Sequence, residues 1–199
     1  MARLEEHIVP FLEKERFRFA RSRLGFSRRV GQVKHTIEVS LDRNNFEDNC
    51  TFWTMWSANA PEYLEWHRRE WRDEKALGDT LASSADWNLR GWSRKPGDSR
   101  RTLVNTDADA AVMASLRRDI EDVGLPFLER ISTWEGAAEH CRLQRWMYDR
   151  AADFLLIAGK REEAHATILE GIRAFEIEGR KDTFGELPRL KRRLARYFA

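Results

Sequence analysis

Nine consecutive residues, from Val33 to Leu41, alternate between two kinds of side chain. In an extended chain, one face would carry Val33, His35, Ile37, Val39 and Leu41, and the other would carry Lys34, Thr36, Glu38 and Ser40. A period of two residues predicts a half-buried β-strand. Because a lone strand leaves its backbone groups unpaired, the chain must build a sheet around it, with one buried face and one polar face.

The flanking segments supply neighbouring strands. Residues 16–23 come close to the same alternation, Gly25 fits a bulge or bend, and Gly31 fits a turn. Residues 49–61 carry no charge, and residues 50–56 are apolar on both faces, which predicts a central strand covered on both sides. Three adjacent strands joined by turns predict an antiparallel meander.

Helical patterns lie on either side of these strands. The first, from residue 4, contains Pro10, which should kink the helix or begin its second part. A second helix is expected over residues 61–77. A third has its N-cap at Thr106 and is expected to stop at Gly124, with Pro126 reinforcing the stop.

Residues 86–105 are interpreted as two short strands around a turn, and from Trp134 onward the pattern is helical. Residues 148–172 match the small and large positions of one tetratricopeptide hairpin, but the period of about 34 residues does not recur, so an ordinary helical hairpin is favoured. Residues 188–199 predict an amphipathic basic helix.

Together these elements predict an α+β fold in which an antiparallel meander is flanked by helices. The predicted organisation is an α+β domain over residues 1–133 and a helical extension over residues 134–199 packed on it, or a single domain that includes both.

The order of these elements resembles a known family. A leading helix, a basic strand with Gly25-Phe26, a meander containing Phe52-Trp53 and a capped helix ending in residues 123–128 (Val-Gly-Leu-Pro-Phe-Leu) follow one another. This arrangement, over roughly residues 4–140, resembles the bacterial family catalogued as the domain of unknown function 4304. The resemblance implies a small antiparallel sheet flanked by helices. It brings no established activity and no functional residues.

Common catalytic and metal-binding motifs are missing from the sequence. No two of the five histidines are spaced three or four residues apart, and no Cys-x-x-Cys occurs, so no metal site and no cofactor are expected. The sequence also lacks a phosphate-binding P-loop and a Gly-x-Ser-x-Gly elbow, which favours a protein that is not an enzyme. His35, on the apolar face of its strand, is interpreted as a paired core histidine or one at a cleft edge, and a tuned base is the alternative.

Basic residues without acids between them mark the one local charge anomaly. Residues 16–37 contain no acid, and residues 90–101 add a second basic cluster. If both clusters lie on one sheet face, they form a basic surface beside Trp87 or Trp92, while the alternative is a solvated face paired with acids from elsewhere. The candidate binding residues for an anion or a partner are Arg16, Arg18, Arg21, Arg23, Arg28, Arg29, Lys34, His35, Trp92 and Arg94.

Three functions remain open. The first hypothesis is a non-enzymatic protein-interaction module, suggested by eight tryptophans and a helical hairpin that could present a face. The alternative is binding of nucleic acid or another polyanion through the basic sheet face, and the second alternative is an enzyme with a site near His35. A bacterial cytoplasmic location without a membrane partner is expected, because Glu5, Glu6 and Glu13 interrupt the start of the chain and no apolar run approaches roughly 20 residues.

Overall fold

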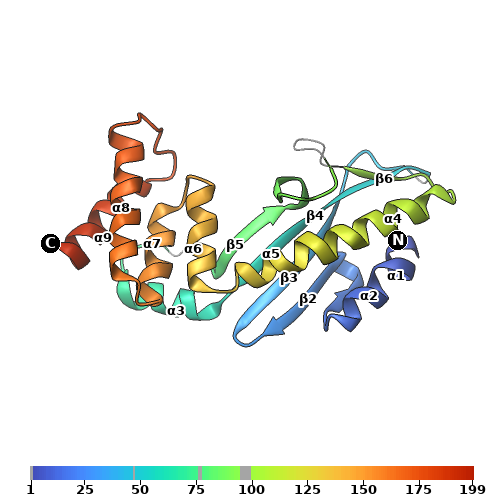
Figure 1. Cartoon of the computed structure of the whole chain (residues 1–199), viewed down its shortest axis with the longest axis horizontal. Helices are drawn as coiled ribbons and strands as arrows, with labels where there is room; N and C mark the ends of the chain where they lie inside the picture. Colours follow the sequence, from blue (N-terminus) through green and yellow to red (C-terminus); the bar gives the residue numbers. More distant parts are fainter. Residues whose placement is uncertain (1, 47, 76–77, 95–99) are drawn as a thin grey trace. The chain divides into compact units, whose positions relative to one another are not determined.

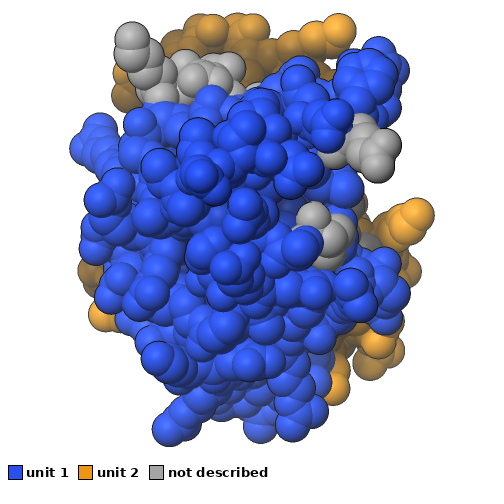
Figure 2. Space-filling model, turned by 90° about the vertical axis from the view of Figure 1, so that its right-hand side faces the viewer, with its two compact units in different colours: residues 1–62, 77–129 blue, residues 63–76, 130–199 orange. Residues whose placement is uncertain are grey.

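The computed structural model of the chain describes residues 2–46, 48–75, 78–94 and 100–199. Contacts divide the chain into two compact units, coloured separately in Figure 2. Unit 1 comprises residues 1–62 and 77–129, and unit 2 comprises residues 63–76 and 130–199. The sequence analysis placed residues 63–76 with the sheet, whereas contacts group them with the C-terminal helices.

Unit 1 is built around an antiparallel sheet, as predicted. Its strands are β1 (Arg18–Ala20), β2 (Gly25–Val30), β3 (Val33–Leu41), β4 (Cys50–Asn59), β5 (Thr80–Ala85) and β6 (Arg101–Leu103). They follow the order β1-β2-β3-β4-β5, and β6 also pairs with β4 (Figure 1). Consecutive strands β1 to β4 form the predicted meander, and the helical C-terminal part completes an α+β fold.

One face of the sheet forms the core of unit 1. Ile37 of β3 is paired with Trp56 of β4, and both are essentially fully buried. On β4 every second residue is buried, while the residues between them are only half-buried. The expectation that both faces of residues 50–56 are covered is therefore wrong for the outer face, which is open enough to carry a site.

Helices of unit 1 cover the inner face. They are α1 (Ala2–His7), α2 (Val9–Lys14), α4 (Ala108–Asp119) and α5 (Leu125–Arg130), and Figure 1 shows α4 and α5 crossing the sheet. Pro10 lies in the first turn of α2, where it removes no helical hydrogen bond, so the predicted second part of the first helix is confirmed.

The predicted helix stop at Gly124 and Pro126 is wrong. The chain continues from α4 through a π-helical segment, Ile120–Gly124, directly into α5, which contains Pro126 near its start. The wider π turn changes the hydrogen-bond register, so the proline, which has no N–H, falls in the opening turn of a new segment. Gly124 permits close packing, since a Cβ there would lie 2.5 Å from the Trp56 ring.

Two strand predictions also need correction. Residues 21–23 form a 3₁₀ turn rather than the end of a strand, so only residues 18–20 of the predicted segment are extended. In the region 86–105, Asp86–Asn88 is a 3₁₀ turn, and among the described residues of this region only Arg101–Leu103 form a strand. The turn expected near residues 95–99 lies outside the described residues.

Unit 2 is helical. It contains α3 (Pro61–Glu70) from Tyr63 onward, α6 (Trp134–Leu143), α7 (Tyr148–Ile157), α8 (Arg161–Glu176) and α9 (Glu186–Phe198). Helices α7 and α8 form the predicted hairpin. Gly171 of α8 allows the two helices to pack closely, because a Cβ there would lie 2.7 Å from Tyr148 Cβ of α7. In the described part of the chain, no helix has the length and apolar content needed to cross a bilayer.

Candidate anion-binding surface

The strand register places two rows of polar side chains on the outer face of the sheet. In an antiparallel sheet, directly paired residues share a face, so a row can be followed from strand to strand. The first row, called here the hydroxyl row, consists of Arg18, Ser27, Thr36, Ser57 and Ser83. The second, called the basic row, consists of Arg29, Lys34, Asn59 and Thr80. The hydroxyl row begins with one cation, Arg18 on β1, and the basic row begins with two, Arg29 on β2 and Lys34 on β3. All other members of the two rows are neutral polar residues.

The cationic ends of the two rows enclose a hollow of about 470 Å³. This cationic hollow is lined by Arg16, Arg18, Ser27, Arg28, Arg29 and Lys34. Five of the ten candidate residues from the sequence analysis are thus brought together, from the end of α2 and from β1, β2 and β3. Since every charged side chain in this lining is positive, the hollow is suited to an anion.

Four of these cations are left unneutralised. Arg16, Arg18, Arg29 and Lys34 are exposed, and none of them forms an ion pair within the described residues. A guanidinium offers a planar set of donors that matches phosphate, and an ammonium adds a point charge. The alternative of a solvated face paired with acids from elsewhere does not describe these four residues.

Arg28 differs, because its side chain turns to the inner face and is only 10% exposed. It donates from Nε to His35 Nδ1 at 3.1 Å and from Nη1 to the backbone oxygen of Glu15 at 3.0 Å. Its guanidinium also lies 4.7 Å from the Phe17 ring centroid and 3.7 Å from a carboxylate oxygen of Glu129. Arg28 therefore lines the hollow, but its guanidinium is already engaged by groups of the inner side.

His35 is a paired core histidine. It is completely buried, and burial together with the neighbouring Arg28 guanidinium lowers its pKa to about 4. The neutral ring accepts the Arg28 bond at Nδ1, and His35 does not line the cationic hollow. This closed environment offers no support for a catalytic base at His35.

Arg16 is held in a strained backbone conformation. Its φ is +65°, in the left-handed region that favours glycine. The N–H of Arg16 bonds to the Glu13 oxygen and that of Phe17 to the Leu12 oxygen, so the chain leaves α2 through a Schellman motif with Arg16 at the usual glycine position. This conformation brings a fourth exposed cation to the hollow from outside the sheet.

The remaining candidate residues lie elsewhere. Arg21 pairs with Glu5 at 2.8 Å, and Arg23 lines the neighbouring hollow described below. Trp92 is only 6% exposed and packs edge-on against Trp56, so it cannot stack on a ligand. Arg94 does not line the cationic hollow.

The second basic cluster therefore does not join the first on one face. Arg101 of β6 points into the core and pairs with Asp119, and Arg100 pairs with Asp42 at 2.8 Å. Both charges are neutralised. The condition that both clusters lie on one sheet face is not met by Arg101, because β6 presents it to the inner side of the sheet. For Arg100 and Arg101 the alternative, pairing with acids from elsewhere in the chain, is the one observed.

A second hollow of about 390 Å³ adjoins the first and was missed by the sequence analysis. It shares Ser27 and Lys34 with the cationic hollow and is called here the hydroxyl hollow. Its lining is completed by Ala20, Arg23, Gly25, Phe26, Thr36, Glu38, Ser57, Asn59, Asp79 and Thr80. The alternation of residues 33–41 placed Thr36 on the polar face, but the pairing partners on β4 and β5 could not be derived from the sequence.

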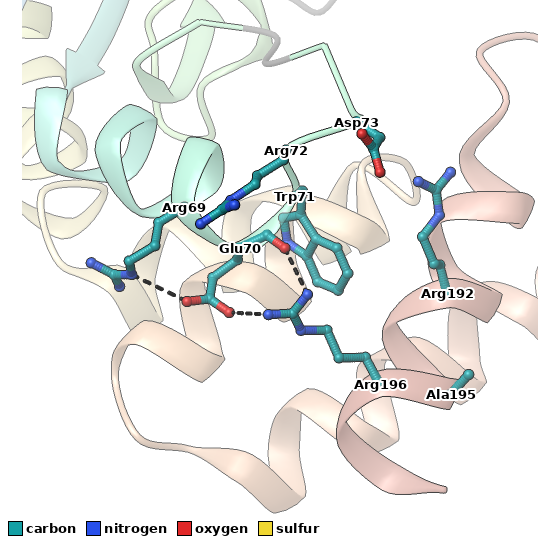
Figure 3. Close-up of a pocket in the computed structure, with 8 residues that line it drawn as sticks. All are labelled: Arg69, Glu70, Trp71, Arg72, Asp73, Arg192, Ala195 and Arg196. Carbon is teal, nitrogen blue, oxygen red and sulfur yellow. Dashed lines mark hydrogen bonds and ion pairs between the residues drawn. The ribbon is translucent and has the colours of Figure 1, made fainter.

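Unit 2 contains a larger hollow, of about 660 Å³, whose charges are largely compensated. Figure 3 shows Glu70 between two arginines: it accepts from Arg69 at 3.2 Å and from Arg196 at 2.8 Å. Arg192, which also lines this hollow, pairs with Glu74 at 3.3 Å. We therefore assign the anion site to unit 1.

No alternative chemistry stands out in the part of the chain that the structure describes. Among those residues, no group of three or more His, Cys, Asp or Glu side chains could hold a metal ion. Burial raises the pKa of the Cys141 thiol to about 12, so it is not a nucleophile at neutral pH.

Comparison of the chain with protein-family models, curated proteins and solved structures gave no match. The resemblance to the domain of unknown function 4304 therefore stays a prediction, and the function must be argued from the surface itself.

Proposed function

We propose that this protein binds a polyanion, single-stranded nucleic acid, through the cationic hollow. The observation that supports the proposal is the convergence of Arg16, Arg18, Arg29 and Lys34 in one hollow without a carboxylate partner among the described residues. Phosphates placed there would release counterions, which is the main source of affinity in nucleic-acid binding.

A polymer suits the site better than a small phosphate compound, because two further hollows adjoin the cationic hollow. The hydroxyl hollow shares Ser27 and Lys34 with the cationic hollow, and a third hollow of about 520 Å³ shares Arg16, Arg28 and Arg29 with it. A ligand that extends beyond the cations therefore finds further room, although Glu15 and Glu129 line the third hollow and reduce its positive charge.

Aromatic side chains farther along the outer face favour a single strand over a duplex. Trp53 lies on the same face of β4 as Ser57 and is half-buried, and its ring centroid lies 6.2 Å from that of Trp87. At about 3.4 Å per residue, Trp53 is roughly 14 Å from Ser57 along the strand. Unstacked bases can use such rings, whereas paired bases cannot.

A charge-matched comparison tests the proposal. The variant R18Q/R29Q/K34Q removes three cations from the hollow, and the control R43Q/R68Q/R118Q removes three exposed cations from other elements. Affinity for a single-stranded oligonucleotide, measured by fluorescence anisotropy at low salt, should fall at least 10-fold in the first variant and much less in the control. Equal losses in both would show non-specific attraction, and the proposal would be abandoned.

A second candidate function, binding of a protein partner, rests on an apolar patch in unit 2. Leu143, Trp146, Ile177 and Phe184 are between 41% and 76% exposed. The Trp146 and Phe184 rings lie 6.4 Å apart, and an ion pair of 2.6 Å from Arg145 to Glu178 ties the two segments together. Exposed aromatic groups held in this way are typical of protein-interaction surfaces.

This second candidate has its own test. Cross-linked complexes from a bacterial extract should be lost in W146S/F184S and kept in F46S, which removes an equally exposed ring from unit 1. If both variants behave like the unaltered protein, the patch has no such role. For either function we propose the cytoplasm as the compartment.

A further inference from the structure

The hydroxyl hollow has a different charge pattern from the cationic hollow beside it. Its lining contains two acids, Glu38 and Asp79, and two cations, Arg23 and Lys34. These charges balance, so the hydroxyl hollow attracts a phosphate less than the all-cationic hollow does. Glu38 follows Thr36 by two residues on the outer face of β3, which separates them by roughly 7 Å. A strand whose phosphates occupy the cationic hollow would place its sugars or bases against the adjoining hydroxyl hollow.

The hydroxyl groups of this hollow have capacity for new hydrogen bonds. Ser27 and Thr36 are direct cross-strand neighbours, and neither hydroxyl bonds to another group in the described residues. A serine or threonine hydroxyl offers one donor and two acceptor positions. Two such groups side by side can serve a ligand hydroxyl both as donor and as acceptor.

The side-chain amide of Asn59, which also lines the hydroxyl hollow, is fixed in one orientation. Thr80 donates to Asn59 Oδ1 at 2.8 Å, and Asn59 Nδ2 donates to Ser57 Oγ at 3.4 Å. Ser57 Oγ accepts that bond, so its own proton is directed elsewhere. Ser57 pairs with Thr36 across β3 and β4, which adds a third hydroxyl to the same line.

We infer that the hydroxyl hollow recognises the ribose 2′-hydroxyl and that the protein prefers single-stranded RNA to DNA. The inference rests on the proposed function, because it requires the phosphates to lie in the cationic hollow. The 2′-hydroxyl is both a donor and an acceptor and is the group by which proteins distinguish RNA from DNA at a given position. The hydroxyl groups of Ser27, Thr36 and Ser57 can donate to and accept from a 2′-hydroxyl. The Glu38 carboxylate offers a further acceptor.

The experiment compares three oligonucleotides of one sequence: RNA, DNA and 2′-O-methyl RNA, which lacks the 2′ donor. The unaltered protein should bind RNA about 10-fold more tightly than either of the others, which corresponds to one or two ordinary hydrogen bonds. In S27A/T36V, which removes both hydroxyls while keeping the side-chain shapes close, the three affinities should become equal by weakening of RNA binding alone.

Two controls separate the possible failures. Ser40 lies on the same strand and face as Thr36, so S40A should keep the RNA preference, whereas K34Q should weaken binding of RNA and DNA equally.

If RNA and DNA bind equally well to the unaltered protein, the inference is overturned while the proposed function stands. If neither binds, the proposed function itself fails. Should S27A/T36V not fold, single 2′-deoxy substitutions along the RNA supply the same comparison with the unaltered protein.

Discussion

Arg28 and His35 face each other across β2 and β3 and form a hydrogen bond from Nε to Nδ1 of 3.1 Å on the inner side of the sheet. The bond requires a neutral imidazole, because a protonated ring has no acceptor and would place two cations in contact. Glu15 and Glu129 each approach Arg28 to 3.7 Å from the other side of its guanidinium. Arg28, which lines the cationic hollow, is therefore held by a bond that depends on the protonation state of one buried histidine.

This relationship predicts a loss of stability in acid. The folded-state pKa of His35 is about 4, against about 6.5 in the unfolded chain, so between these values only the unfolded state binds the proton. Stability from this group is complete above pH 6.5 and declines as the pH falls, by up to about 1.4 kcal/mol per unit. In H35N, whose Oδ1 can replace Nδ1 as acceptor without titrating, the decrease between pH 7 and pH 5 should be smaller by about 2 kcal/mol. Urea unfolding at the two pH values measures it, and equal decreases would contradict the assignment.

Substitution of Arg16 by glycine should affect stability and oligonucleotide binding in opposite directions. In R16G the strain of the left-handed conformation disappears, and the free energy of unfolding should rise by about 1 kcal/mol. The same substitution removes a cation from the hollow, so oligonucleotide affinity should fall by about 3- to 10-fold. R145G is the matched control, because Arg145 has a φ of +54° in unit 2, and its affinity should not change. A stabilised R16G with full affinity would remove Arg16 from the site.

Adding a methyl group at Gly124, in the π-helical segment, should lower the stability of the protein. In G124A the new methyl group would lie 2.5 Å from the Trp56 ring, so the helix or the indole must move. The expected loss is about 1–3 kcal/mol. The control G25A places its methyl 3.5 Å from the nearest atom and should cost far less. Thermal unfolding of both variants measures the difference, and a G124A protein as stable as G25A would contradict this packing.

The buried ion pairs of Arg193 should contribute strongly to the packing of α9 within unit 2. It is 1% exposed and bonds to both carboxylate oxygens of Asp153, at 2.8 and 2.6 Å, and to Glu74 at 3.1 Å. R193M leaves a buried carboxylate without its partner and should cost about 3–5 kcal/mol. Arg192 also pairs with Glu74 but is 49% exposed, so R192M should cost less than about 1 kcal/mol. Similar losses in denaturant unfolding of the two variants would show that burial is not the deciding factor.

The extent to which the sequence predicted the site can be followed in particular residues. The alternation of residues 33–41 correctly predicted β3, the burial of His35 and the outward position of Lys34, because a strand period depends on local order alone. The small residues of β5 have little strand propensity, and the segment was missed. The partners of Thr36 on β2 and β4 depend on long-range register, which no local pattern contains.

Tertiary packing decided the remaining differences. Gly124 was interpreted as a helix stop, but its role follows from an indole ring far away in the sequence. Arg101 was grouped with exposed cations because its charge is visible in the sequence, whereas its orientation toward Asp119 depends on the pairing of β6 with β4. Trp92 was placed beside the basic face because it is close to these cations in the sequence, although its ring is part of the core.

The salt dependence of oligonucleotide binding tests the central claim most directly. For single strands, the logarithm of the binding constant falls with the logarithm of salt concentration by about 0.7 for each phosphate contact. Contacts from Arg16, Arg18, Arg29 and Lys34 therefore predict a slope of about −3 for the unaltered protein and about −1 for R18Q/R29Q/K34Q. A slope near −3 in both proteins would place the phosphate contacts elsewhere and contradict the assignment of the cationic hollow.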